Sequence, residues 1–373
     1  MNSMSDERTL LNTFSEIASH PRRQMDQYLA RGLKIVGCQA PYAPEEIVHA
    51  MGMVPMGLWG ADMALSEAKR YFPTFICSIM QSMVELGIRG AYDGMSCILM
   101  PSLCDAMQAT VENWKYAVPS IPIVYADYPQ NRFGKAGHDY LKATHERQIA
   151  RLTELTGATC TDEALSQSIE IYKEHAETMK AFSELAGKCG MKPSDRSAVF
   201  KSAWFMLKQE HTALVRELMA VMKPCGEKKI GVMTTGILAD QPGLLRIMDG
   251  LNMTILCDDV AHESRQSFFC YPKAETPLDM LADKFCTMKH CSLIYDPQKT
   301  RIGLILEEAR AHGAKGIIFI QTKFCDPEEF DYVFLKRACE SAGIPLIMIE
   351  ADRQMTNYDQ AGTALQTFCE MIQ

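Results

Sequence analysis

Short apolar runs alternate with amphipathic segments along much of this chain, and that alternation constrains the fold more than any other feature. In the first part of the chain the apolar runs are 34–38, 54–60, 95–101 and 121–127. Helical segments are expected near 78–89 and 105–117, between these runs. Strand and helix alternating at this spacing predicts a parallel sheet with right-handed crossovers. The last two runs are continuously apolar, as expected of strands buried on both faces.

A second series of the same kind occupies the end of the chain. Its apolar runs are 228–236, 252–261, 315–325 and 344–352, and its helical segments at 300–313 and 327–343 each end in a glycine, as helices often do. Between the two series, residues 137–222 carry apolar side chains at helical spacing and no clear strand. We therefore predict an α/β protein with two doubly wound parallel-sheet lobes and a helical block between or around them. The predicted domains are 1–136 with a leading helix, 137–226 and 227–373.

Size and charge narrow the class of protein. A chain of 373 residues should hold roughly two or three domains, and its formal charge of −8 argues against the basic face that nucleic-acid binding needs. The first residues are polar and mixed in charge, unlike a signal peptide. No apolar stretch approaches the roughly 20 residues that span a bilayer. We expect a soluble cytoplasmic protein that contacts neither membrane nor nucleic acid.

Three of the fourteen cysteines sit where an apolar run ends and a helix begins: Cys77, Cys104 and Cys325. The last two share one pattern, an apolar run, then Cys-Asp, then a helical segment. A helix N-terminus favours negative charge and is expected to lower a thiol pKa, and thiolates are the ligands of iron–sulfur clusters. Ligands of open parallel sheets bind beyond the carboxyl ends of the strands, so the two matching cysteines are predicted to face one cleft that Cys77 can join.

The cysteine spacing leaves a plainer interpretation open. Intervals of 27 and 221 residues match no compact ferredoxin or zinc motif, and buried or helix-capping cysteines remain an alternative. In a reducing compartment the other cysteines are expected to be small apolar residues rather than disulfides. Cys38, at a strand end, is interpreted as buried. Cys286 and Cys291, with His290, are interpreted as structural residues of an amphipathic helix rather than a metal site.

Several acidic residues have a local explanation. Pro44 followed by Glu45 and Glu46 is typical of a helix start, and Asp105 and Asp326 are expected to serve the first turns of the helices that follow the two cysteines.

Further polar residues stand at predicted strand ends. Thr234 to Gly236, Asp258 and Asp259 are expected to face the same cleft, where they would contact a ligand or a partner subunit. The chain contains no P-loop, no G-x-G-x-x-G, no H-E-x-x-H and no G-x-S-x-G motif, so we do not expect it to hydrolyse ATP.

Taken together in order, six segments resemble one family, the beta subunits of the 2-hydroxyacyl-CoA dehydratases, which share a superfamily with benzoyl-CoA reductase subunits. The resemblance extends from about residue 30 to the end. The segments are PYAPEEIVHAMGMVPMGLWG (41–60), YFPTFICSIMQSMVELG (71–87), MPSLCDAM (100–107), TTGILAD (234–240), CDDVAHESR (257–265) and FCDPEEFDY (324–332).

The resemblance implies an oxygen-sensitive enzyme of anaerobic metabolism with two α/β lobes and one [4Fe–4S] cluster. By motif, the three cluster cysteines match Cys77, Cys104 and Cys325. It also implies a heterodimer with a homologous alpha subunit and a separate ATP-hydrolysing iron–sulfur activator. The activator supplies an electron that reduces an acyl-CoA substrate to a ketyl radical anion, hydroxide leaves C2, a proton leaves C3, and the electron is recovered. The beta subunit is implied to relay the electron, while catalytic residues of the alpha subunit have no counterpart to assign here.

Two other functions compete with this one. A benzoyl-CoA reductase-type subunit would leave its electrons in a ring-reduced product. A two-lobed small-ligand binding protein would need neither iron nor a partner. The acyl group of the substrate, and whether this chain touches CoA, stay open at the level of sequence.

Overall fold

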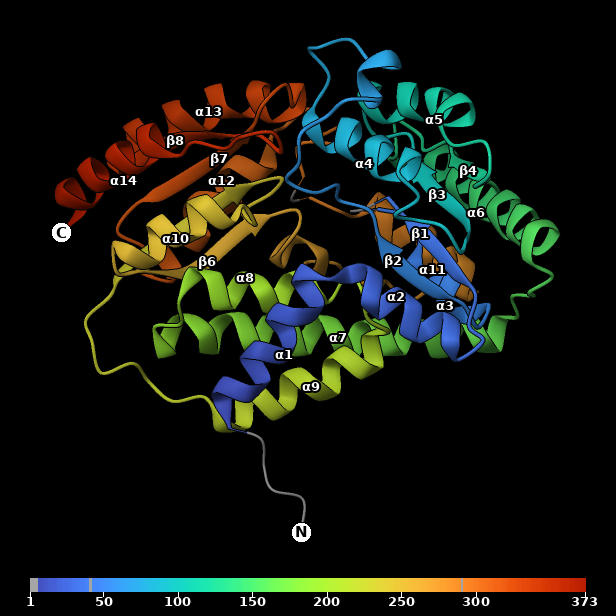
Figure 1. The fold of residues 1–373 in the computed structure, drawn as a ribbon, viewed down its shortest axis with the longest axis horizontal. Coiled ribbons are helices and arrows are strands. Elements are labelled where there is room, and N and C mark those ends of the chain that lie inside the picture. The colour runs from blue at the N-terminus through green and yellow to red at the C-terminus, as the bar shows by residue number, and fades with distance from the viewer. Residues whose placement is uncertain (1–5, 40–41, 290) are drawn as a thin grey trace.

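The computed structural model describes residues 6–39, 42–289 and 291–373. Within these residues the chain forms fourteen α-helices and eight strands, and the strands make two separate four-stranded sheets (Figure 1). All strand pairs in both sheets are parallel. The predicted α/β class with two parallel-sheet lobes is therefore confirmed.

The first sheet contains β1 (Ile35–Cys38), β2 (Val54–Gly57), β3 (Met95–Pro101) and β4 (Ile123–Ala126), in the order β2-β1-β3-β4. Every residue of β1 and β2 is buried, which explains why these strands are continuously apolar. The crossover helices are α3 (Glu45–Ala50), α4 (Ser78–Ile88) and α5 (Asp105–Ala117). The predicted strands of this lobe are confirmed to within a few residues at each end.

The second sheet repeats this arrangement. Its strands β5 (Ile230–Gly236), β6 (Met253–Val260), β7 (Ile317–Thr322) and β8 (Leu346–Ala351) lie in the order β6-β5-β7-β8. The strand order changes direction between β1 and β3 in the first lobe and between β5 and β7 in the second. In parallel sheets of this kind, such a switch point is where ligands bind. The associated helices are α10 (Pro242–Gly250), α12 (Thr300–Ala311), α13 (Asp326–Ala342) and α14 (Asp359–Ile372). Helix α11 (Pro277–Cys286) follows β6 in the sequence but packs in the first lobe, where Leu281 shares an apolar cluster with Val36 and Cys38 of β1.

Between the two series of strands the chain is helical. This part comprises α6 (Gly134–Thr156), α7 (Asp162–Cys189), α8 (Pro193–Ser202) and α9 (Lys208–Val221). The N-terminal helices are α1 (Glu7–Ser19) and α2 (Pro21–Ala30), and α1 buries Leu11 and Phe14 in one apolar cluster with Phe182 of α7 and Phe200 of α8. In Figure 1 the helices α1, α2, α7, α8 and α9 lie together below the two sheets, whereas α6 lies beside β4 of the first sheet.

The two sheets meet over a shared core. One cluster of buried apolar residues includes Met100 and Trp114 of the first lobe, Trp204 after α8, and Ile237 and Cys325 of the second lobe. Burial of this apolar surface holds the two lobes in one arrangement. In the residues described, no helix combines the length and apolar character that a bilayer span needs.

Candidate functional site: a three-cysteine cavity

The three cysteines singled out by sequence each occupy the residue before a helix. Cys77 is the N-cap of α4, Cys104 that of α5 and Cys325 that of α13. The last two follow β3 and β7, which occupy equivalent positions in the two sheets. A tight turn brings the chain from β7 to Cys325, whose N–H donates to the carbonyl of Thr322 at 3.0 Å. The prediction that these cysteines lie where strands hand over to helices is confirmed.

All three cysteines line one cavity of about 530 Å³. Residues 103–106, 292–297 and 324–327 supply most of the remaining wall. The volume falls within the roughly 300–1,000 Å³ that small-molecule and cofactor sites occupy. Segments separated by more than 200 residues thus converge on one space, as the parallel-sheet argument predicted for Cys104 and Cys325.

The three thiols lie close enough to act on one another, since Cys77 affects the ionisation of Cys104 and both affect that of Cys325. Among the described residues, no group of three His, Cys, Asp or Glu side chains is arranged to hold a single metal ion. A four-iron cluster makes a different demand, because each thiolate binds a separate iron and the sulfurs therefore stand farther apart. Three sulfur donors around one cavity therefore fit a four-iron cluster better than a single metal ion.

Burial raises the pKa of all three thiols above their ordinary value, to about 12 for Cys104. Mutual repulsion contributes: the charge of Cys77 raises the pKa of Cys104, and Glu328, Cys77 and Cys104 raise that of Cys325. Main-chain N–H groups in the first helical turns act in the opposite direction but are outweighed. The expectation that helix N-termini lower these pKa values is therefore wrong for the metal-free chain, because burial dominates.

Asp105 and Asp326 also line the cavity, each in the first turn of its helix. Neither helix has a side-chain hydrogen bond at its cap, where the cysteine stands. The aspartates therefore support their helices through charge at the N-terminus rather than by capping hydrogen bonds. Each is also placed close enough to act on a thiol, since Asp326 adds to the effect of burial on the pKa of Cys77.

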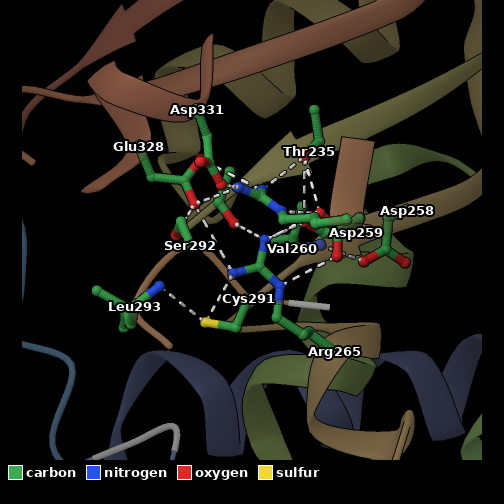
Figure 2. A network of polar contacts seen from close by, with 12 residues as sticks. Thr235, Asp258, Asp259, Val260, Arg265, Cys291, Ser292, Leu293, Glu328 and Asp331 are labelled. Atoms are coloured by element: carbon green, nitrogen blue, oxygen red, sulfur yellow. Dashed lines mark hydrogen bonds and ion pairs between the residues drawn. The ribbon is translucent and has the colours of Figure 1, made fainter. Parts of the chain in front are cut away.

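A buried ion network lies in the second lobe and includes Glu328, whose main chain bonds Cys325 (the network is drawn in Figure 2). Arg301 donates to Asp259 at 2.7 Å and to Thr235 at 3.0 Å, and its guanidinium lies 3.1 Å from both Glu328 and Asp331. Its side chain is 3 % exposed. Burial disfavours its charge, but Asp259 and Glu328 reverse that effect and raise the pKa of Arg301 well above its ordinary value.

The network reaches the cavity wall through Glu328 and the segment after α11. Glu328 lies in the first turn of α13, its N–H donates to the carbonyl of Cys325 at 3.0 Å, and its carboxylate accepts a 2.5 Å hydrogen bond from Ser292. Arg265 bonds Asp259 and contacts the sulfur of Cys291 at 3.5 Å. The same ions therefore hold both the cysteine helix and the facing wall of the cavity.

The prediction that Asp258 and Asp259 face the cleft is wrong. Both were expected to face the cleft and contact a ligand or a partner subunit, yet both are buried inside the second lobe. Asp258 pairs with Arg196, and Asp259 pairs with Arg265 and Arg301. Thr234 to Gly236 are buried as well, and the carbonyl of Gly236 accepts from Arg265 at 3.1 Å. Asp258, Asp259 and the Gly236 carbonyl support the fold, because arginines of other segments satisfy their polar groups internally.

Another buried arginine, Arg353, joins the lobes beside Cys77. Its N–H donates to the hydroxyl of Ser78 at 3.0 Å, and its guanidinium lies 2.9 Å from Asp62 and from Asp240. Ser78 is the first residue of α4, directly after Cys77. This contact was not predicted, because its one signal in the sequence is an arginine directly after the apolar run 344–352.

The remaining cysteines considered from sequence lie outside the cavity wall. Cys38 is fully buried in a separate apolar cluster of the first lobe, which confirms the structural interpretation. The single helix expected over Cys286 and Cys291 is wrong, because α11 ends at Cys286 and Cys291 lies beyond it. His290 lies outside the described residues.

Glu45 and Glu46 open α3 with Pro44 as its N-cap, as predicted for a helix start. Both are also buried and ion-paired, Glu45 with Lys208 and Glu46 with Lys284. These pairs tie α3 to α9 and α11, a structural role that the local sequence pattern did not indicate.

Known proteins resemble this chain over its whole length. The family described as 2-hydroxyglutaryl-CoA dehydratase, D-component, matches residues 41–372. The (R)-phenyllactyl-CoA dehydratase beta subunit of Clostridium sporogenes is 44 % identical, with 99 % of this chain and 100 % of that protein covered. The lactoyl-CoA dehydratase subunit beta of Anaerotignum propionicum is 37 % identical, over 99 % and 100 %. The (R)-2-hydroxyglutaryl-CoA dehydratase subunit beta of Acidaminococcus fermentans is 33 % identical, over 97 % and 99 %.

A two-lobed parallel α/β fold with a thiol-lined cavity thus coincides with one family of dehydratase components. The chain belongs to the 2-hydroxyglutaryl-CoA dehydratase D-component family, and the family resemblance predicted from sequence is confirmed.

Proposed function

We propose that this chain is the beta subunit of a 2-hydroxyacyl-CoA dehydratase, a hydro-lyase that converts an (R)-2-hydroxyacyl-CoA into a 2-enoyl-CoA. The observation that carries the proposal is full-length similarity to three proteins named as beta subunits of such enzymes. A homologous alpha subunit completes the enzyme. An ATP-hydrolysing activator supplies the electron, since this chain has no P-loop of its own.

Cys77, Cys104 and Cys325 are proposed to hold a [4Fe–4S] cluster as thiolates. The fit rests on three sulfur donors around one cavity and on the main-chain N–H groups of three helix starts, which stabilise thiolate charge. When bound, the cluster supplies one-electron transfer, which lets this subunit relay an electron from the activator. Contacts within the chain fix the positions of the cysteines. Arg353 bonds Ser78 directly after Cys77, and Arg301 pairs with Glu328 in the helix that follows Cys325.

The reaction explains why such machinery is needed. The C3 hydrogen of a 2-hydroxyacyl thioester is beta to the carbonyl and is not acidic, so a general base alone cannot remove it. One-electron reduction of the thioester to a ketyl radical anion reverses the polarity, expels hydroxide from C2 and acidifies C3. Chemistry of this kind is supplied by a cofactor, while the protein binds and positions it.

The cluster assignment has a direct test. Purified without oxygen, the wild-type chain with its partner should contain about four iron and four sulfide per chain. Cys104→Ala and Cys325→Ala should each lose most of that iron while helical content persists. Cys369→Ala is the matched control, because Cys369 is buried in the core of the second lobe and away from the cavity. Unchanged iron in both cavity variants would refute the assignment.

The reaction itself is tested by product analysis. The chain, its alpha subunit and the activator should convert one or more of phenyllactyl-, lactoyl- and 2-hydroxyglutaryl-CoA into enoyl thioesters under anaerobic conditions. Ring-reduced thioesters from aromatic acyl-CoA would instead support a reductase of the benzoyl-CoA type. Ligand binding without iron, partner or turnover would support a two-lobed binding protein.

A further inference from the structure

Apolar side chains gather at the mouth of the cysteine cavity instead of being buried. Tyr295, Phe324 and Phe330 line the cavity and are 51 %, 38 % and 70 % exposed. Phe330, Val333 and Phe334 follow one another at the spacing that places side chains on one face of a helix, and the last two are 47 % and 46 % exposed. We call these five residues the rim patch.

Two features indicate that the rim patch is functional rather than incidental. The twelve large apolar residues exposed in the described part of the chain include all five of these, although the cavity mouth and one helix face are a small part of the surface. Phe324 also has a φ of +61°, in the left-handed region that bulky residues avoid at a cost of about 1–3 kcal/mol. The chain therefore tolerates local strain directly before Cys325 and leaves the Phe324 ring partly exposed at the cavity.

The size of the rim patch matches the apolar part of a stable interface. The exposed fractions of the five residues add up to about 2.5 complete side chains. At 150–250 Å² per aromatic side chain, this corresponds to roughly 400–600 Å² of exposed surface. A standard interface covers about 800 Å² of each partner, of which about 57–65 % is apolar. The rim patch alone supplies an area of that order. It also equals the largest apolar patch that most monomers expose, and such patches are often functional.

We propose that the rim patch docks the alpha subunit, whose binding closes the mouth of the cysteine cavity. This inference rests on the proposed function, which supplies a permanent partner. Permanent complexes have apolar interfaces that resemble a core, whereas transient electron-transfer encounters bury little surface. An activator must leave after delivering its electron, so aromatic rings at the mouth suit the permanent subunit better.

The surface is tested by binding rather than by turnover. In Phe330→Glu/Val333→Glu, two charges enter the centre of the proposed interface, and the dissociation constant for the alpha subunit should rise at least about 100-fold. Phe330→Ala/Val333→Ala should raise it about tenfold or more. Met371→Glu is the control, because Met371 is 67 % exposed at the end of α14 and should leave binding unchanged. Binding is measured by anaerobic sedimentation of the purified pair, and thermal unfolding checks that each variant folds.

Hydrogen exchange gives a second readout that needs no variant. Amides of residues 324–337 should be protected when the wild-type chain binds the alpha subunit. Unchanged affinity of the glutamate variant, or no protection there, would overturn the proposal. Loss of activator-dependent reduction with an intact heterodimer would assign the patch to the activator, and loss of a homodimer would assign it to a second copy; either result also overturns it. If the wild-type chain binds no alpha subunit at all, the proposed function fails instead.

Discussion

Replacing Arg301 with methionine tests the ion network behind Cys325. Methionine keeps an unbranched apolar stem and removes the charge, together with the hydrogen bonds to Asp259 and Thr235. The network is balanced in wild type, with three cations facing three carboxylates. The cations are Lys299, Arg265 and Arg301, and the carboxylates are those of Asp259, Glu328 and Asp331.

Removal of one cation leaves one buried carboxylate uncompensated. The side chains of Glu328, Asp331 and Asp259 are at most 4 % exposed, so solvent screens the excess charge very little. Breaking a buried pair in this way costs about 3–5 kcal/mol. That loss is a large fraction of the about 5–15 kcal/mol by which folded proteins are usually stable. We therefore expect Arg301→Met to lower the free energy of unfolding of the metal-free chain by about 3–5 kcal/mol.

The assay is urea unfolding of metal-free protein, followed by circular dichroism. Arg310→Met is the control, because Arg310 is an exposed arginine at the other end of α12 and should change stability by less than about 0.5 kcal/mol. Adding Glu328→Gln to Arg301→Met restores the charge balance and should recover at least about 1 kcal/mol. A single-variant loss below about 1 kcal/mol, or strictly additive losses in the double variant, would refute the charge-balance reasoning.

Two further predictions concern the cysteine helices. Burial opposes ionisation of Glu85, but hydrogen bonds from Ala68, Ser66 and Arg89 outweigh it and lower its pKa from 4.5 to about 2. The contribution of Glu85 to stability is therefore present above pH 4.5 and lost as the pH falls toward 2. Glu85→Gln should destabilise the chain by about 3 kcal/mol at neutral pH but very little near pH 2. Equal destabilisation at both pH values in urea titrations would contradict this. The pKa of Cys104 is about 12, so its thiol must lose a proton before it can bind iron. Anaerobic reconstitution of the cluster in weak buffer should therefore release protons and proceed faster at alkaline pH. Assembly without proton release would show that the thiols were already ionised.

Much of the fold could be predicted because its signals are local. Strands buried on both faces are continuously apolar, and β3 and β7 were found for that reason. Parallel pairing followed from the helices between them. The same argument placed Cys104 and Cys325 at corresponding sheet edges, since the carboxyl ends of parallel strands share one edge.

The electrostatics of the site could not be predicted, because its partners are distant in sequence. Arg353 and Ser78 are 275 residues apart, and Arg301 lies 42 residues from Asp259. The rise in the thiol pKa of Cys104 has the same origin. A helix N-terminus is a local signal that the sequence displays, whereas burial in the folded chain is a tertiary effect that outweighs it.

The repeated sheet order explains why the cavity carries three thiols. Each lobe contributes one cysteine after its third strand, Cys104 after β3 and Cys325 after β7. The first lobe adds Cys77, on the connection that follows β2. The corresponding connection of the second lobe, after β6, contains Cys270, Cys286 and Cys291, but none of the three is part of the cavity wall. The sulfur of Cys291 is held by Arg265 and by the Leu293 N–H.

Residues 292–297 of the same connection form part of the cavity wall, and they include Ser292 and Tyr295. Ser292 is fixed by Glu328 of the buried network, and Tyr295 belongs to the rim patch. The segment 292–297 therefore belongs both to the cavity wall and to the rim patch, and Ser292 connects it to the buried ion network. A subunit docked on the rim patch would contact this segment, which Glu328 links to the helix that begins after Cys325.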